Sequence, residues 1–163
     1  WAKELYGFAE HVPETEEYGV TSYVYRERRP FVTEKIAAIL EGPMPGVIRA
    51  KGHFWLATRP DWVAEFSLAG VLKCVEPLGI WWASVPKERW PDTETFRQYA
   101  AERWAEPWGD RRQEIVFIGF GIDWPAMKAR LDDALLPEAA AASVGTLPVL
   151  PDPFPRWQRP EAA

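Results

Sequence analysis

The sequence predicts an α+β fold, in which a mainly antiparallel sheet of about four to five strands has three helices packed against it. Two patterns lead to this prediction. Short runs of alternating or β-branched residues are separated by hairpin-type turns, and three stretches with helical spacing of apolar residues interrupt them. The length of 163 residues agrees with one domain that can bury a core of its own.

The first predicted strand covers residues 18–28, where side chains alternate between two largely covered faces. Pro30 ends it, and Thr33 is a suitable N-cap for a helix over residues 34–41. A second strand is predicted at residues 47–57. The helix over residues 34–41 would bury Ile36, Ile39 and Leu40.

Arg59-Pro60-Asp61 has turn chemistry, so residues 62–68 are predicted to pair back as a third strand. Residues 69–79 are compatible with either a further strand or a twisted connection. Strand character is clear again at residues 80–85, before Pro86.

Asp92 is a suitable N-cap for a helix over residues 93–104, and the last strand is predicted at residues 115–122. Asp123 should cap the final helix, because Pro125 then falls in its first turn. The inner face of that helix would carry Met127, Leu131, Leu135 and Leu136.

Three segments follow from this pattern. Residues 1–17 form an N-terminal linker arm, residues 18–137 form the domain, and residues 138–163 form a Pro-rich tail. Prolines prevent the tail from forming a helix or a strand ladder, yet Phe154 and Trp157 would be costly to leave in water. We therefore expect the tail to be docked on the domain in an extended conformation.

Composition argues against several classes of function. The net charge of −5 and the acid among Arg26-Glu27-Arg28-Arg29 argue against nucleic-acid binding, which needs clustered cations. No apolar run approaches 18 residues and no signal-like N-terminus is visible, so no membrane association is expected. A single cysteine fits a reducing, cytoplasmic compartment.

No catalytic or metal-binding residues are expected. Adjacent acids such as Asp132 and Asp133 lack a sign of a pocket that would separate their pKa values, and no GxSxG motif is present. His11, His53 and Cys74 show no metal-ligand spacing. We interpret His53 as a hydrogen-bonded core or edge histidine and Cys74 as a small buried apolar group.

Trp81 and Trp82 raise the possibility of an aromatic ligand surface. Neighbouring residues of a strand face opposite sides, so the two rings cannot share one platform. We expect one to pack under a helix and the other to face a partner. The alternative function in this case is an independent small-ligand or metal-binding domain that uses an aromatic surface.

Residues 110–114 form a charged block, comprising Asp110, Arg111, Arg112, Gln113 and Glu114. Arginine presents a planar fork that matches carboxylates, and the other three residues can hold such a fork in place. Two interpretations stay open. The block is either a structural lock inside the domain or an interface that recognises a GTPase domain or a client protein.

Several motifs resemble a known family. They are WAEPWGDRRQEIVFIG at residues 104–119, GHFWLATRP at residues 52–60 and PDPFPRW at residues 151–157. Together they resemble the C-terminal domain of the CobW family of P-loop GTPases, proposed metal chaperones. The resemblance extends from about Pro13 to Trp157.

The resemblance implies a non-catalytic interaction and regulatory domain of a GTP-dependent chaperone, linked to zinc homeostasis or cobalamin synthesis. The expected partners are the GTPase domain of the same protein and a client metalloprotein, and a second copy of the chain is a further candidate. GTP, Mg²⁺ and a cargo metal, zinc first, would belong to the rest of the protein.

The family's P-loop, GxxxxGK[ST], is absent from the sequence, as is its Cys-x-Cys-Cys motif. The His-rich tract and last-helix cysteine of some relatives are absent too. Because the chain starts at Trp1 and its first methionine is Met44, we expect a piece of a longer protein.

Overall fold

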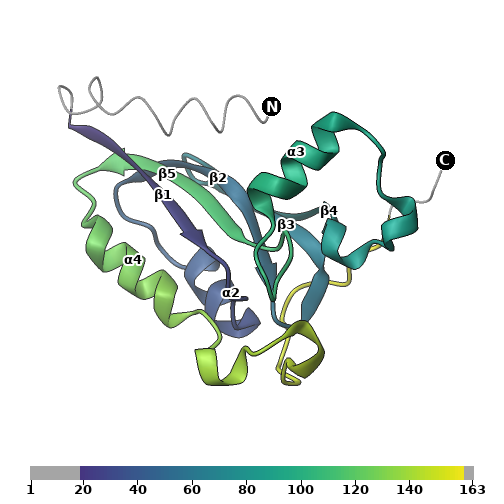
Figure 1. The fold of residues 1–163 in the computed structure, drawn as a ribbon. Helices are drawn as coiled ribbons and strands as arrows, with labels where there is room; N and C mark the ends of the chain where they lie inside the picture. The colour runs from purple at the N-terminus through teal and green to yellow at the C-terminus, as the bar shows by residue number, and fades with distance from the viewer. Residues whose placement is uncertain (1–18, 160–163) are drawn as a thin grey trace.

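A computed structural model describes residues 19–159 of the chain, so the linker arm predicted at residues 1–17 lies outside the described residues. Five strands form one antiparallel sheet in the order β1-β5-β2-β3-β4 (Figure 1). The strands are β1 (Val20–Glu27), β2 (Val47–Leu56), β3 (Arg59–Ala69), β4 (Leu72–Ile80) and β5 (Gln113–Phe120).

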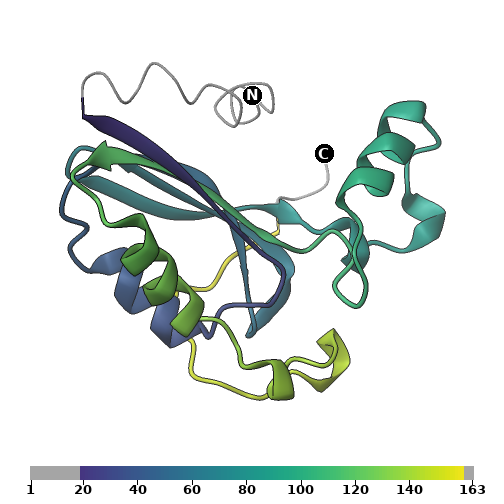
Figure 2. The same ribbon diagram turned by 60° about the vertical axis from the view of Figure 1, so that its left-hand side comes forward.

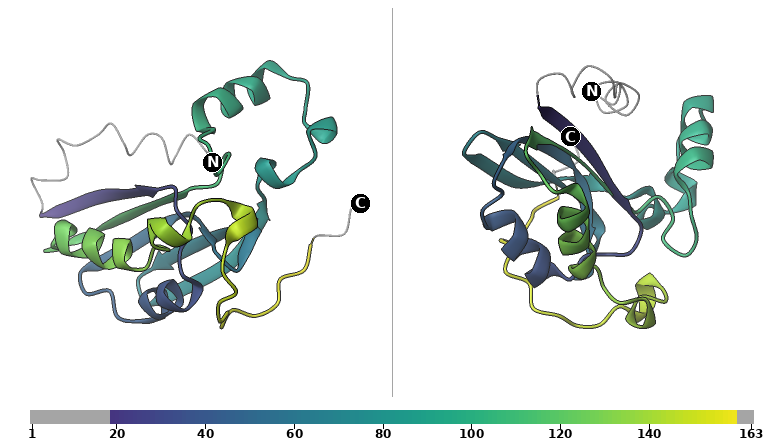
Figure 3. Two further views of the ribbon diagram at one scale, coloured as in Figure 1. Left: turned by 60° about the horizontal axis from the view of Figure 1, so that its bottom comes forward. Right: turned by 90° about the vertical axis from the view of Figure 1, so that its left-hand side faces the viewer.

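Three α-helices accompany the sheet in this part of the chain. α2 (Thr33–Glu41) and α4 (Trp124–Asp133) lie side by side on one face of the sheet (Figures 2 and 3). α3 (Glu94–Arg103) instead projects beyond the end of the sheet, and none of its residues is buried. The predicted α+β class with an antiparallel sheet and three helices is confirmed.

The main core lies between the sheet and the α2–α4 pair. Alternate residues of each strand point into it, as in Phe54 of β2 and Phe117 of β5, both fully buried. Gly52 of β2 lies against β5, where a Cβ would come within 2.1 Å of the Glu114 carbonyl oxygen. The central strands therefore approach closely only because this position has no side chain.

The helix caps differ from those predicted at two helices. Thr33 belongs to α2 and is buried, with its hydroxyl 2.7 Å from that of Thr58, so it does not cap the helix. Thr93, rather than Asp92, caps α3 by accepting a hydrogen bond from the Phe96 amide. Asp123 caps α4 as predicted, accepting from the Ala126 amide at 3.0 Å.

The turn after β2 is shorter than predicted. Leu56 pairs directly with Arg59, so Ala57 and Thr58 alone form the turn and β3 includes Arg59. The ambiguous residues 69–79 contain most of the edge strand β4.

The strand predicted at residues 80–85 is wrong beyond Ile80. A short 3₁₀ turn, Trp82–Ser84, replaces it. The reason is that the Trp82 and Ala83 amides donate to the Asp110 carboxylate and are unavailable for a ladder.

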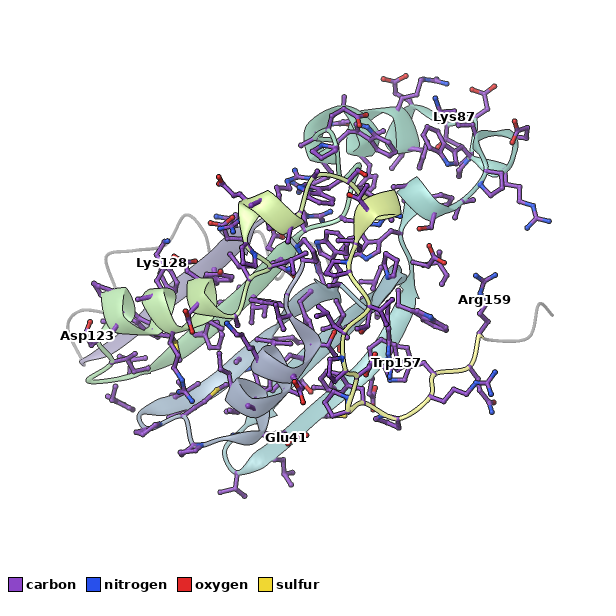
Figure 4. The ribbon with its side chains drawn as sticks, turned by 90° about the horizontal axis from the view of Figure 1, so that it is seen from below. Glu41, Lys87, Asp123, Lys128, Trp157 and Arg159 are labelled. Atoms are coloured by element: carbon purple, nitrogen blue, oxygen red, sulfur yellow. The ribbon has the colours of Figure 1, made fainter. Side chains whose placement is uncertain are left out.

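The tail runs extended under the sheet after two 3₁₀ turns, Glu138–Ala140 and Val144–Thr146. Trp157 packs edge-on against Trp62 of β3, with ring centroids 5.8 Å apart. Figure 4 shows Trp157 against the strands and Arg159 pointing away from the domain. Phe154 also packs on the main core.

Candidate functional site

The charged block lies at the base of a lobe that extends from the sheet. We call residues 81–110 the α3 lobe; it contains the two 3₁₀ turns Trp82–Ser84 and Lys87–Arg89 and the helix α3. Lys87 lies at the outer part of the lobe (Figure 4). The lobe has its own aromatic cluster, with ring centroids 4.9 to 6.4 Å apart, formed by Trp82, Trp90, Phe96, Tyr99 and Trp104.

Asp110 joins the two ends of the lobe. Its carboxylate accepts hydrogen bonds from the Trp82 amide at 3.1 Å and the Ala83 amide at 2.9 Å. It also accepts from the Tyr99 hydroxyl at 3.1 Å. The residue is 1% exposed, so three donors offset the desolvation of one buried carboxylate.

Arg111 ties the lobe to the sheet. Its Nε donates to the Pro60 carbonyl of β3 at 2.7 Å, and its Nη2 donates to the Ser84 hydroxyl at 2.5 Å. Nη1 donates to the Trp108 carbonyl at 3.1 Å. Burial lowers the pKa of this guanidinium, while Asp110 and Asp61 act in the opposite direction.

Gln113 holds the start of β5 in place. Its side-chain oxygen accepts from the Trp55 amide at 2.8 Å, and its side-chain nitrogen donates to the Arg29 carbonyl at 2.7 Å. β5 begins two residues earlier than predicted, because Gln113 and Glu114 already pair with Glu27 and Arg26 of β1.

Arg112 lies between two hollows at the lobe base. Its Nη1 donates to the Asp110 carbonyl at 2.9 Å, and its guanidinium lies 5.9 Å from both the Trp81 and Tyr99 ring centroids. Among residues 19–159, its Nε has no hydrogen-bond partner, although Glu114 is 4.0 Å away.

The first hollow is an arginine cleft of about 310 Å³. We define it by four arginines that line it, Arg26, Arg28, Arg103 and Arg112. Glu114 also lines it and pairs with Arg26 at 3.2 Å across the β1–β5 ladder.

Sequence reasoning missed the role of Arg28. Its Nη1 donates to the carbonyls of Arg103, at 2.6 Å, and Gly109, at 3.1 Å, so it holds both ends of the segment after α3. The signal was present in the Arg26-to-Arg29 cluster, where alternation favours one face for Arg26 and Arg28.

The second hollow, of about 270 Å³, brings His53 together with Trp81, Trp82, Tyr99 and Arg112. His53 Nε2 is buried without a partner in the described chain, so the predicted hydrogen bond there is wrong. Burial, reinforced by Arg112, lowers the pKa of His53 to about 4. The ring is therefore neutral at physiological pH.

Both tryptophans of the pair are packed, on different sides. Trp82 contacts Phe96 under α3, as expected for one of the two. Trp81 is 3% exposed and donates through Nε1 to the Trp62 carbonyl, so the expectation that the other ring faces a partner is wrong.

Cys74 is exposed, contrary to the prediction of a buried thiol. Val75 packs on the core, so its neighbour points to the face that the helices leave uncovered. A hydrogen bond to Glu76 raises the pKa of the thiol.

Two negative findings concern residues 19–159 only. No group of three or more His, Cys, Asp or Glu side chains there is placed to hold a metal ion. No helix in that range is long and apolar enough to cross a membrane.

Comparison with known proteins gives a consistent result. Residues 20–135 match the family described as the cobalamin synthesis protein cobW C-terminal domain. The chain is 38% identical over 143 residues to zinc-regulated GTPase metalloprotein activator 1 of Dictyostelium discoideum, covering 85% of this chain and 30% of that protein.

A zinc chaperone of Mycobacterium tuberculosis is 31% identical over 134 residues, covering 82% of this chain and 34% of that protein. This chain thus spans about a third of the length of these relatives. In fold it is similar to the Zn(II)-bound YjiA GTPase of E. coli, with a TM-score of 0.52 and 14% identity over 74% of this chain and 31% of that one.

Proposed function

The chain belongs to the family of CobW C-terminal domains, and we propose that it is the non-catalytic interaction and regulatory domain of a GTP-dependent metal chaperone. The observation that carries the proposal is the match over residues 20–135 in a sequence that has no P-loop. The relatives named as a zinc-regulated GTPase metalloprotein activator and as a zinc chaperone support zinc as the cargo.

Four members of the charged block support the structural lock in this proposal. Asp110, Arg111 and Gln113 are bonded to groups of the same domain, and Arg112 is held by the Asp110 carbonyl. Their role is to fix the α3 lobe on the sheet. Partner recognition is then left to the lobe's outer surface and the arginine cleft, where Glu114 lies.

The proposed partners are a GTPase domain in the same protein and a client metalloprotein, and a second copy of the chain is a further candidate. GTP, Mg²⁺ and the cargo metal would bind outside this domain. The cytoplasm is the compartment that this function requires for access to GTP.

One observation favours a second function, small-ligand binding at the His53 hollow. The hollow combines aromatic walls with two polar groups, His53 and Arg112, that lack a hydrogen bond at one nitrogen within the described chain. Such a combination is typical of small-molecule sites. It would make this domain an independent binding module.

Equilibrium dialysis of the full chain against Zn²⁺ and GTP tests the proposed non-catalytic role. The proposal predicts no stoichiometric tight binding of either, and no GTP hydrolysis. Tight zinc binding at one ion per chain, or GTP turnover, would contradict it and support an independent metal-binding or catalytic domain.

A further inference from the structure

The arginine cleft gathers four guanidinium groups from three separate parts of the chain. Arg26 and Arg28 come from β1 and the residues after it, Arg103 ends α3, and Arg112 directly precedes β5. Such convergence is unusual in a chain whose net charge is −5. Fixing the α3 lobe on the sheet does not require all four arginines. In residues 19–159, Arg26 bonds to Glu114 and makes no hydrogen bond to the lobe.

These cations are crowded. The pKa of Arg28 is lowered first by burial and then by Arg112, and the pKa of Arg103 is lowered by the same two causes in the same order. Neighbouring like charges repel one another, so a negative group placed among these arginines would be stabilised by all of them.

The cleft already accommodates one carboxylate. Glu114 accepts from Arg26 Nε at 3.2 Å and its Oε2 lies 4.0 Å from Arg112 Nε. The Glu114 side chain is largely buried, whereas that of Arg26 is 54% exposed. One internal carboxylate thus lies beside two of the arginines, and the exposed side chain of Arg26 is accessible to a second carboxylate.

We propose that the arginine cleft binds an acidic side chain presented by a protein segment. Arginine forks match carboxylates with two parallel hydrogen bonds. Glu27 and Glu102 also line the cleft and would repel an extended polyanion, which favours a short acidic motif over a nucleic acid. The inference rests on the proposed function only in taking the partner to be a protein.

The probe is a fluorescein-labelled hexaglutamate peptide, with hexaglutamine as its neutral counterpart, followed by fluorescence anisotropy at low ionic strength. The intact chain should bind hexaglutamate and not hexaglutamine. Arg26→Gln combined with Arg103→Gln should weaken binding about fivefold or more, as expected for two partly exposed charge contacts. Arg130→Gln, at an exposed position of α4, is the control and should change the affinity less than about twofold.

A second arm tests the internal competitor. Glu114→Gln should strengthen hexaglutamate binding about threefold, because a carboxylate that occupies the same arginines is removed. Glu41→Gln makes the same change of net charge at the exposed end of α2 and should have no such effect. Circular dichroism of each variant would check that it is folded.

Equal binding of the two peptides, or equal binding by the double arginine variant and the intact chain, would overturn the proposal. The proposed source of the acidic segment is another protein, so replacing Glu14, Glu16 and Glu17 of this chain with Gln should leave peptide affinity unchanged. A rise in affinity would show that these residues compete for the cleft and would overturn that assignment. The assay needs neither GTP nor metal, so its failure would leave the proposed chaperone function standing.

Discussion

His53 is the residue whose ionisation most directly links the lobe base to stability. Its pKa is lowered from 6.5 to about 4 by burial and by Arg112, so the folded state holds the ring neutral. The unfolded chain binds the proton more readily between these values, so folding stability should fall as pH drops from about 6.5 towards 4. The loss of folding free energy should approach about 3 kcal/mol once the pH is below about 4.

Urea denaturation of the intact chain and of His53→Gln between pH 7 and pH 4 measures this loss. The variant should show a flatter pH dependence across the window, because Gln does not titrate. If both proteins lose stability in parallel, carboxylate titration alone causes the decline and His53 is not neutral by burial.

Arg111 provides the test of the structural lock. Its three hydrogen bonds reach Pro60, Ser84 and Trp108, and the residue is 5% exposed. Arg111→Ala should therefore lower the free energy of unfolding by about 3 kcal/mol, in the range for breaking a buried charged contact. Chemical denaturation measures it.

The matched control is Arg97→Ala, which removes exposed pairs with Asp92 and Glu94 on α3 and should cost less than about 1 kcal/mol. Similar small losses in both variants would remove the lock and return Arg111 to the interface interpretation.

At this scale the sequence could identify the charged block but not its orientation. Arg111 and Arg112 are adjacent, and both are buried only because residues 81–110 fold back to Asp110. That closure joins amides about 27 positions away in the sequence, and local patterns carry no information on it. Both interpretations of the block were therefore open until the lobe was placed.

Among the elements, the tail has the most specific anchor. Asp152 accepts two hydrogen bonds from Arg59, at 2.7 and 2.9 Å, and Arg59 also donates to the Phe154 and Pro155 carbonyls. The guanidinium lies 4.3 Å from the Trp157 ring centroid. Hydrogen bonds from Arg59 and Thr58 outweigh burial and lower the pKa of Asp152.

Truncation after Val149 should lower the melting temperature by several degrees, because two rings worth roughly 1.5 to 3 kcal/mol each lose their contacts. Removing residues 158–163 should change it little. Arg59→Ala should destabilise the intact chain by more than it destabilises the truncated one, because its partners are gone there. Calorimetry of these five proteins measures the changes, and additive effects of Arg59→Ala and the truncation after Val149 would show that Arg59 does not anchor the tail.

Element prediction succeeded where a local signal determined the outcome. Asp123 with Pro125 located the start of α4, alternation located β1, and an apolar run rich in β-branched residues located β5 within a few residues. It failed at residues 80–85, where strand propensity was outweighed by the distant Asp110 carboxylate.

In the whole molecule, the packed sheet and the projecting α3 lobe are separate parts. One sheet face is covered by α2 and α4, and the α3 lobe stands beyond the sheet end (Figure 2). The arginine cleft lies where β1, α3 and β5 meet. A partner bound there, as we propose, would contact both the sheet and the lobe.

The central claim is that this domain is coupled to a nucleotide-dependent partner, and binding linkage tests it most directly. The full chain would be titrated by calorimetry into the proposed GTPase domain of the same protein, loaded with GDP or with a non-hydrolysable GTP analogue. We expect affinities that differ about fivefold or more, the lower end of usual allosteric coupling. Equal affinity in both states, or no association in either, would contradict the regulatory role.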